Sequence, residues 1–401
     1  MDPNFELPED HRFHIGLSHH MESDIKFLND WHIRAEYIYT KHENAPHWVD
    51  LTQTPSGVTL PDGRPQYMGI DPLLPGCDAT FNGIGQGFSG SEIFPGGACD
   101  DESNENQDIL MTNGVEGDTS SFALILGKDF AFSDKTSFDM SFGYAYTDSE
   151  TGNAINSSTA WSNYEEVSVA IPGQVTLAPN LWANKHNITL RGRLQHYFLE
   201  NHPTTFSFFF NRRSGRPFSY AYEDDTVEEY FGDSDDEARI LIYVPTGPSD
   251  PLMNFDAFDV ANDPDGPAEL AALFAFIESS GLGKYAGGIA PRNAFNAPWS
   301  SDLDIRIKQP IPLGGDHTLD VFLDIENVLN IFSDNDNIKR YPHTDDVQEA
   351  ARLLEIQQFG GPVNNFDQFE ITRWYNEGHN WNEDVDDSVY RIQLGVQYRF
   401  R

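Results

Sequence analysis

The feature that most constrains this chain is the alternation of apolar and polar residues in segments of strand length. In the last residues, SVYRIQLGVQYRFR, every second side chain from Tyr390 to Phe400 is apolar, and Arg, Gln and Gly lie between them. A period of two predicts a β-strand with one apolar and one polar face. A soluble sheet buries its apolar face against a core, whereas a membrane barrel turns that face toward lipid and its polar face toward a wet interior.

About nine such segments recur, and the connections between them alternate between short and long. The segments lie near residues 13–19, 31–40, 122–126, 137–147, 186–198, 205–222, 301–309, 317–330 and 388–401. The short connections lie near 20–30, 128–136, 200–204 and 310–316, and the long ones near 42–119, 148–185, 223–299 and 329–388. Outer-membrane barrels have short periplasmic turns and long extracellular loops. We therefore expect an all-β fold, an antiparallel transmembrane β-barrel.

The long loops are expected to carry short helices and acidic runs. The stretch PDGPAELAALFAFIESSGLG has apolar residues at helical spacing, with Pro267 near its start and Gly281 as its stop. A second helix is expected near Asp345 to Gln358. Two stretches, DPDGPAE and SDNDN, could hold a weakly bound Ca²⁺, although neither has EF-hand spacing. We expect no other cofactor and no metal site.

The net charge narrows the classes of function. The chain has 64 acidic and 25 basic side chains, a net charge of -39, which argues against nucleic-acid binding. No apolar run is long enough for a membrane-spanning helix, and the first residues, MDPNFE, lack the basic and apolar regions of a signal peptide. No motif brings together a nucleophile, a base and an acid, so we expect no enzyme.

Two cysteines, Cys77 and Cys99, lie in one stretch rich in Gly, Pro and Asp without metal-ligand spacing. A disulfide is expected if this loop faces an oxidising compartment, and two unpaired thiols are the alternative.

The polar faces of the expected strands concentrate charge. The candidate residues for a charged lumen-facing site are Arg191, Arg193, Arg212, Arg216, Arg306, Asp320, Asp324, Glu326, Arg391 and Arg399, and Arg213 and Lys308 share these faces. Pairing across the 310–316 turn is expected to bring Arg306 and Arg399 to Asp320. Such a set could hold the wall together, dock a plug inside the barrel or bind an anionic ligand.

Several motifs resemble the C-terminal barrel of TonB-dependent outer-membrane receptors, most closely the Oar-like branch. They are SGRPFSY, RNAFNAPW, DLDIRIKQPIPL, VFLDIENVLN, AEYIYTKHENA and PDGRPQY, and together they span most of the chain. The resemblance implies a 22-stranded barrel in the Gram-negative outer membrane, an N-terminal plug domain, and a TonB box that couples ligand uptake to the inner-membrane proton gradient. Tyr398 and Phe400 would belong to the C-terminal signature for barrel assembly, although the chain ends on Arg401.

The chain departs from the family because it has no plug, no TonB box, no signal peptide and about nine strands. We expect it to be the C-terminal part of a longer receptor, whose partners would be outer-membrane lipid, its own plug, the TonB complex and an extracellular ligand. Two alternatives remain open. One is a surface-adhesion or protein-binding barrel without transport, and the other is a small porin-like barrel.

Overall fold

The computed structural model describes the chain except residues 26, 84–86, 102–107, 154, 156, 175, 224–229, 233–238, 333–336, 343–349, 360–366, 376–380 and 401. The described part is mostly β-structure, built around one large antiparallel sheet. The strands are β1 (Glu9–Met21), β2 (Trp31–Glu43), β3 (Pro46–Asp50), β4 (Gln53–Thr59), β5 (Pro65–Gly69), β6 (Thr80–Gly83), β7 (Gly87–Ser89), β8 (Ile109–Asn113), β9 (Gly117–Ser133), β10 (Thr136–Thr151), β11 (Ala178–Pro179), β12 (His186–Leu199), β13 (His202–Arg213), β14 (Pro217–Tyr222), β15 (Met253–Asn254), β16 (Phe295–Asn296), β17 (Ser300–Gly314), β18 (His317–Glu326), β19 (Lys339–Pro342), β20 (Ala350–Phe359), β21 (Gln368–Trp374), β22 (Trp381–Asp384) and β23 (Arg391–Phe400). The helices are α1 (Ala160–Glu165), α3 (Gly266–Ser280), α4 (Val385–Ser388) and the 3₁₀ turns η2 (Asp256–Phe258), η3 (Leu282–Tyr285) and η4 (Val328–Ile331).

Nine long strands form the main sheet, in the order β1-β2-β9-β10-β12-β13-β17-β18-β23, and β11 adds a short pairing to β10. Each long strand pairs antiparallel with the next one along the chain. The sheet is open, because β1 and β23 form its edges and no further strand in the described part of the chain pairs with either. The expected large antiparallel arrangement is therefore confirmed, and closure of a barrel is not part of this structure.

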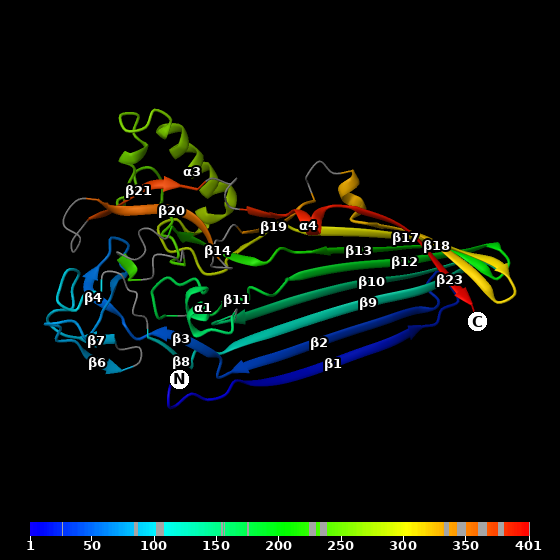
Figure 1. Cartoon of the computed structure of the whole chain (residues 1–401), viewed down its shortest axis with the longest axis horizontal. Helices are drawn as coiled ribbons and strands as arrows, with labels where there is room; N and C mark the ends of the chain where they lie inside the picture. The colour runs from blue at the N-terminus through cyan, green and yellow to red at the C-terminus, as the bar shows by residue number, and fades with distance from the viewer. Residues whose placement is uncertain are drawn as a thin grey trace.

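The two ends of the sheet differ, as the alternating connections predicted (Figure 1). Four short turns, residues 22–30, 134–135, 200–201 and 315–316, lie at one end. Four long loops, residues 44–116, 152–185, 214–299 and 327–390, lie at the other end, which we call the cap end. The opposite end is the turn end.

The apolar face of the sheet is continuous across the strands because cross-strand partners share a face. One row consists of Phe130, Phe138, Leu194, Phe206, Ile307, Leu323 and Leu394. Many of these side chains are open to solvent, with exposed fractions of 74% for Leu394 and 67% for Val396. Burying such a face is worth about 25 cal/mol per Å², so an apolar surface of this extent needs a cover.

Charged residues on the apolar face lie toward the ends of the strands. Arg212 follows Phe210 at the cap end, and Lys128 lies at the turn end, opposite Trp31, the first residue of β2. Lys128 is buried, and its Nζ donates to the backbone oxygens of Phe27 and Asn29 at 2.6 Å each, which ties the first turn to β9. Between these two levels the apolar face of the nine strands carries no Asp, Glu, Lys or Arg.

The four long loops fold into a single unit, the loop cap, that contains the largest hydrophobic core (Figure 1). Its five-stranded sheet has the order β15-β21-β20-β14-β16, in which β14 from the third loop pairs parallel with β20 from the fourth. Leu60 from the first loop and Val169 from the second are buried in the same core. The cap is therefore a folded module, with long-range pairing between loops.

The structure confirms one of the two expected loop helices and contradicts the other. Helix α3 ends before Gly281, whose φ of 88° is a left-handed conformation that glycine adopts without strain. The second expected helix, Asp345 to Gln358, is wrong over its described part, because residues from Ala350 onward form β20. Residues 345–349 lie outside the described part of the chain. No helix in the described part is long and apolar enough to cross a membrane.

Candidate functional site

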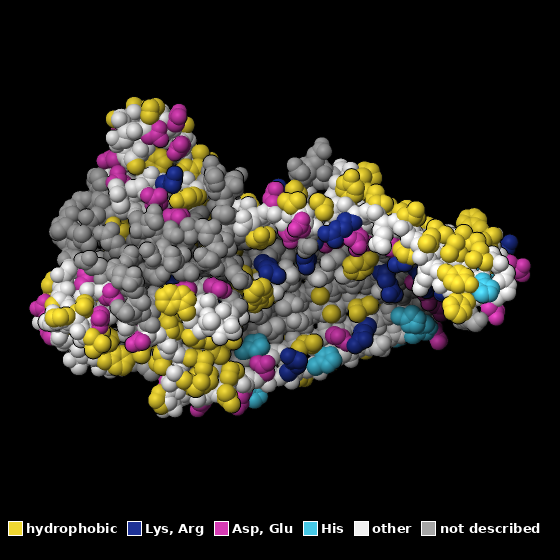
Figure 2. Space-filling model, in the orientation of Figure 1, with side chains coloured by type: hydrophobic (Ala, Val, Ile, Leu, Met, Phe, Trp, Pro, Cys, Tyr) yellow, Lys and Arg dark blue, Asp and Glu magenta, His cyan; other side chains and the backbone are white. Residues whose placement is uncertain are grey.

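The polar face of the main sheet gathers most of the predicted charged residues. The row Arg193, Ser207, Arg306, Asp324 and Gln393 runs directly across five strands, so these side chains share one face. Lys, Arg and His side chains are visible along the strands between the cap and the turn end (Figure 2). We call this surface the charged face.

Asp320 is the centre of the charged face near the turn end. Its side chain is fully buried, and its carboxylate lies 2.9 Å from the Nζ of Lys308 and accepts a 2.8 Å hydrogen bond from Arg399. Two cations from the neighbouring strands β17 and β23 therefore compensate one buried carboxylate on β18. This arrangement joins three strands through charge-assisted hydrogen bonds.

The contact expected between Arg306 and Asp320 is wrong, whereas that between Arg399 and Asp320 is present. Arg306 lies opposite Asp324, and its Nε is 3.4 Å from that carboxylate. Asp320 lies opposite Pro310, four residues along β18 from Asp324, so Arg306 and Asp320 are not cross-strand neighbours. Lys308 takes the place beside Asp320 that Arg306 was expected to fill.

Two other predicted charged-face residues lie elsewhere. Arg212 is paired with Ile188 and belongs to the apolar face, where its guanidinium lies 5.5 Å from the ring centre of Trp299. Arg216 comes after the end of β13 and lies 4.7 Å over the ring of Trp182. Strand alternation explains the first error, because Arg213, one residue along, takes the charged face.

The remaining predicted residues lie on the charged face with different partners. Arg193 donates to Asp139 at 2.7 Å, and Arg191 is exposed on the same strand. Glu326 lies opposite Arg391, whose guanidinium donates at 3.3 Å to the backbone oxygen of Asp386. Tyr398 and Phe400 lie on the apolar face, and the Tyr398 hydroxyl is 2.6 Å from the Nδ1 of His317.

An aromatic ring packs among the charges. Phe322 lies opposite Gly395, where a Cβ atom would be 2.2 Å from the ring. The guanidinium of Arg306 lies 4.6 Å above the same ring. Glycine is needed at position 395 because the ring occupies the space of a side chain, an arrangement that stabilises glycines in sheets.

Three buried arginines join the cap loops to one another, and sequence inspection did not find them. Arg64 donates to the backbone oxygens of Ala170 and Leu241 at 3.0 and 2.9 Å and pairs with Asp62. Arg239 donates to Tyr164 O at 2.8 Å, and Arg292 donates to the backbone oxygens of Thr151 and Thr176, each at 3.2 Å. Their acceptors are carbonyl groups in other loops or at the end of β10, which no sequence motif marks.

His47 lies close to two of these arginines. Burial, together with the positive charges of Arg239 and Arg292, lowers its pKa to about 4, although the backbone of Gly173 partly opposes the shift. The imidazole is therefore neutral in the folded cap at neutral pH. Protonation of His47 in acid would place a third positive charge beside Arg239 and Arg292, which is unfavourable.

Cys77 and Cys99 are joined by a disulfide, as the sequence led us to expect. Cys99 is fully buried in a small cluster with Met68 and Ile70, and Phe88 packs against it. The disulfide thus closes part of the first cap loop around a local apolar cluster.

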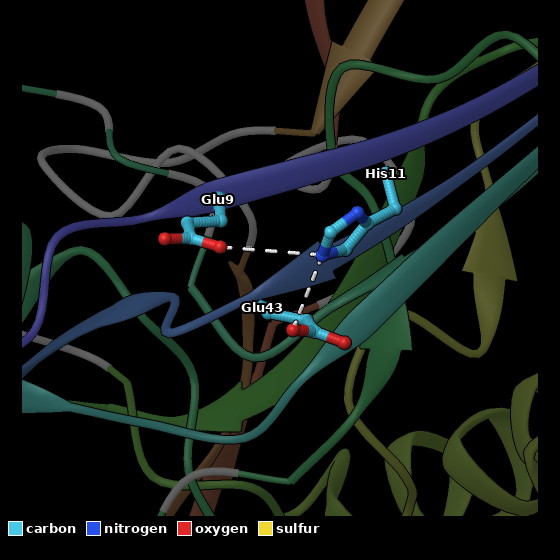
Figure 3. A group of neighbouring side chains, drawn as sticks. All are labelled: Glu9, His11 and Glu43. Carbon is cyan, nitrogen blue, oxygen red and sulfur yellow. Dashed lines mark ion pairs between the residues drawn. The ribbon is translucent and has the colours of Figure 1, made fainter.

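Among the described residues, one group has metal-ligand spacing, formed by Glu9, His11 and Glu43 (Figure 3). The Nε2 of His11 is 4.0 Å from the Glu9 carboxylate and 3.5 Å from that of Glu43. Glu9 precedes His11 by two residues on β1, and the pairing of β1 with β2 adds Glu43 to the group. Lys41 already lies 2.5 Å from the Glu43 carboxylate and supplies a cation there.

The described residues of the possible Ca²⁺ stretches form no such group. In DPDGPAE, Asp263 accepts the backbone N–H of Asp265 at 3.0 Å ahead of α3. Most of SDNDN, residues 333–336, lies outside the described part of the chain.

Several cavities of the described chain could admit a small molecule. One, of about 370 Å³, has an aromatic lining that includes Phe218, Tyr220 and Trp381. Another, of about 740 Å³, lies beside α3 and is lined by Phe255 and Phe274, among other residues. A further cavity, of about 440 Å³, lies beside α4.

A cavity of about 430 Å³ lies where β13 and β17 meet the cap and is lined by Arg213, Arg216, Lys339, Arg340 and Asp384, among other residues. We call this one the basic cavity.

A scan against models of known protein families finds no match to this chain. A search of curated proteins likewise finds no match.

Proposed function

We propose that the nine long strands are part of a larger outer-membrane β-barrel and that the chain is the C-terminal part of a TonB-dependent receptor for an extracellular ligand. The observation that carries this proposal is the exposed apolar face, whose strand residues from the level of Arg212 to the turn end include no charged side chain other than Lys128. Strands of 10 to 17 residues are long enough to cross the roughly 30 Å hydrocarbon core when tilted.

The two ends of the sheet support an orientation. Short turns on one side and long loops on the other match the periplasmic and extracellular sides of such barrels. The loop cap then faces the outside, where a disulfide such as Cys77–Cys99 is stable. The charged face lines the lumen, and a plug domain docks against it.

The unpaired edges of the sheet support the proposal that these nine strands form only part of the barrel. Backbone N–H and C=O groups of β1 and β23 would each cost several kcal/mol if they were left unpaired in hydrocarbon. Further strands of the same protein therefore close the barrel, and uptake requires them together with the plug and the TonB box. The reading frame upstream of this chain tests that part of the proposal, because it must encode plug and TonB-box sequences.

A second candidate is a surface-adhesion or protein-binding barrel without transport. The loop cap favours it, because a module with its own core and with contributions from all four loops could present a binding surface by itself. An upstream frame that encodes strands and a signal peptide but no plug would favour this candidate over the receptor.

Surface labelling tests the orientation. A membrane-impermeant maleimide is applied to intact cells that make the whole protein with a cysteine at one of two exposed sites, Ala272→Cys in α3 or Asp316→Cys in the last turn. We expect labelling of position 272 in intact cells and of position 316 only after lysis. Equal labelling of both positions in intact cells, or of neither before lysis, would contradict the proposal.

A further inference from the structure

The basic cavity is unusual for so acidic a chain. Four of the 25 basic side chains in the sequence, Arg213, Arg216, Lys339 and Arg340, line one cavity of about 430 Å³ together with the single carboxylate Asp384. Small-molecule sites in proteins commonly have volumes of about 300 to 1,000 Å³. The cavity is therefore large enough for a small ligand, and its lining carries an excess of positive charge.

Two of the four cations have carboxylate partners. The Nζ of Lys339 is 3.4 Å from Asp302, and Arg340 is 3.1 Å from Glu383. Arg213 instead donates to the hydroxyl of Ser300 at 3.3 Å, and Arg216 stacks on Trp182. Within the described part of the chain, no carboxylate lies at ion-pair distance from either arginine. They keep hydrogen-bond donors for a ligand.

The two arginines also act on each other. Burial and, secondly, the positive charge of Arg213 lower the pKa of Arg216. Two guanidinium groups close enough to repel are stabilised by an anion between them. Guanidinium groups match the planar, two-oxygen geometry of carboxylates and phosphates.

The segment that carries the arginines is held in place. The backbone N–H of Ser214 donates to the backbone oxygen of His186, and the Ser214 hydroxyl accepts from the backbone N–H of His186. The side-chain amide of Asn184 donates to the backbone oxygen of Ser214 at 2.7 Å. At Gly215 a Cβ atom would lie 2.0 Å from the backbone oxygen of Ala297, so the two chain segments are in close contact. Fixed donors lose little conformational entropy when a ligand binds.

We propose that the basic cavity binds a small polyanion through carboxylate or phosphate groups held by Arg213 and Arg216. Because Arg213 projects onto the charged face, the site lies where that face meets the cap. The proposal that this site binds the transported ligand rests on the proposed receptor function. The proposal that it binds an anion depends on the cavity alone. The same chemistry could come from a soluble anion or from an anionic lipid headgroup.

Calorimetric titration of the protein in neutral detergent tests this at constant ionic strength, which keeps screening equal. The probes are citrate and inorganic pyrophosphate for soluble anions, and phosphatidylglycerol against phosphatidylcholine, each in mixed micelles with the same detergent, for a headgroup. We expect saturable 1:1 binding of at least one probe. Arg213→Gln and Arg216→Gln should each weaken it by about tenfold or more, as loss of a charge-assisted hydrogen bond does.

Arg12→Gln is the matched control, because Arg12 is an exposed arginine on the charged face of the edge strand β1, which is separated from β13 by four strands. It should leave affinity within about twofold, and near-ultraviolet circular dichroism should verify the fold of each variant. If Arg213→Gln disturbs the fold through Ser300, Arg216→Gln alone decides. Binding of phosphatidylglycerol alone, lost in Arg216→Gln, would support the anion site and identify the headgroup.

Absence of saturable binding, or equal weakening by the control, would overturn the proposal. Because the titration needs no membrane insertion, its failure is distinct from failure of the barrel assignment.

Discussion

At the residue scale, Asp320 supports the most direct prediction about the charged face. Asp320→Asn should destabilise the sheet by about 2 kcal/mol, because it leaves Lys308 and Arg399 without their shared carboxylate. The value lies below that for a fully buried pair because both cations are partly exposed and screened by solvent. Urea unfolding in detergent measures it. The same substitution in the exposed turn, Asp316→Asn, should change stability by less than 0.5 kcal/mol, roughly the limit for surface positions; equal effects would refute the role of Asp320.

The glycine beneath Phe322 supports a second prediction at this scale. Gly395→Ala should cost about 1 to 3 kcal/mol, because the added Cβ would lie 2.2 Å from the ring. The cost should largely vanish in a Phe322→Ala background, where no ring opposes the new methyl group. A double-mutant cycle measures this coupling. Additive effects of the two substitutions would mean that the ring contact does not determine the choice of glycine.

At the element scale, the loop cap should weaken in acid through His47. Its folded pKa of about 4 lies below the ordinary value of 6.5, so the unfolded chain binds the proton more readily. The stabilising contribution is complete above about pH 6.5 and is lost as the pH falls toward 4, by up to roughly 3 kcal/mol. Urea midpoints of near-ultraviolet circular dichroism should follow this window.

Acid also titrates carboxylates, so His47→Gln provides the comparison. The variant has no imidazole and should lose the part of the pH dependence that falls between 6.5 and 4. An unchanged pH profile in His47→Gln would assign the acid sensitivity to other groups.

The sequence allowed the elements of the main sheet to be predicted because their cause is local. Alternation sets which side chains share a face, and nine such segments correspond to the nine long strands. The end of α3 was likewise readable from Gly281. The β20 strand was not, because its stretch has a helical pattern and is held extended by pairing with β14 and β21.

The contacts of the candidate site were harder to predict from the sequence. The register of β17 and β18 places Arg306 opposite Asp324, and Asp320 lies four residues farther along β18, opposite Pro310. The buried arginines of the cap bind carbonyl groups far away in the chain. Arg213 becomes part of a candidate binding site only because the folded loops place Arg216 and Lys339 in the same cavity. These contacts depend on tertiary structure, which leaves no local pattern.

At the scale of the whole molecule, the account depends on what covers the apolar face. Figure 1 shows the long sheet extending away from the cap, and large apolar side chains remain exposed on strands from β1 to β23. A soluble protein would bury such a face beneath a second layer, whereas a barrel exposes it to lipid. The charged face is formed by the alternate residues of the same strands, and it should face water in the lumen.

Spin-label accessibility tests this claim most directly, with the complete protein in lipid vesicles. Labels are placed on the adjacent residues Gln393→Cys and Leu394→Cys of β23, which the strand directs to opposite faces. We predict that the label at 394 collides with oxygen, which concentrates in hydrocarbon, and is protected from a water-soluble nickel reagent, with the opposite result at 393. A label at 394 that the nickel reagent reaches freely, or that neither reagent reaches, would contradict the membrane barrel.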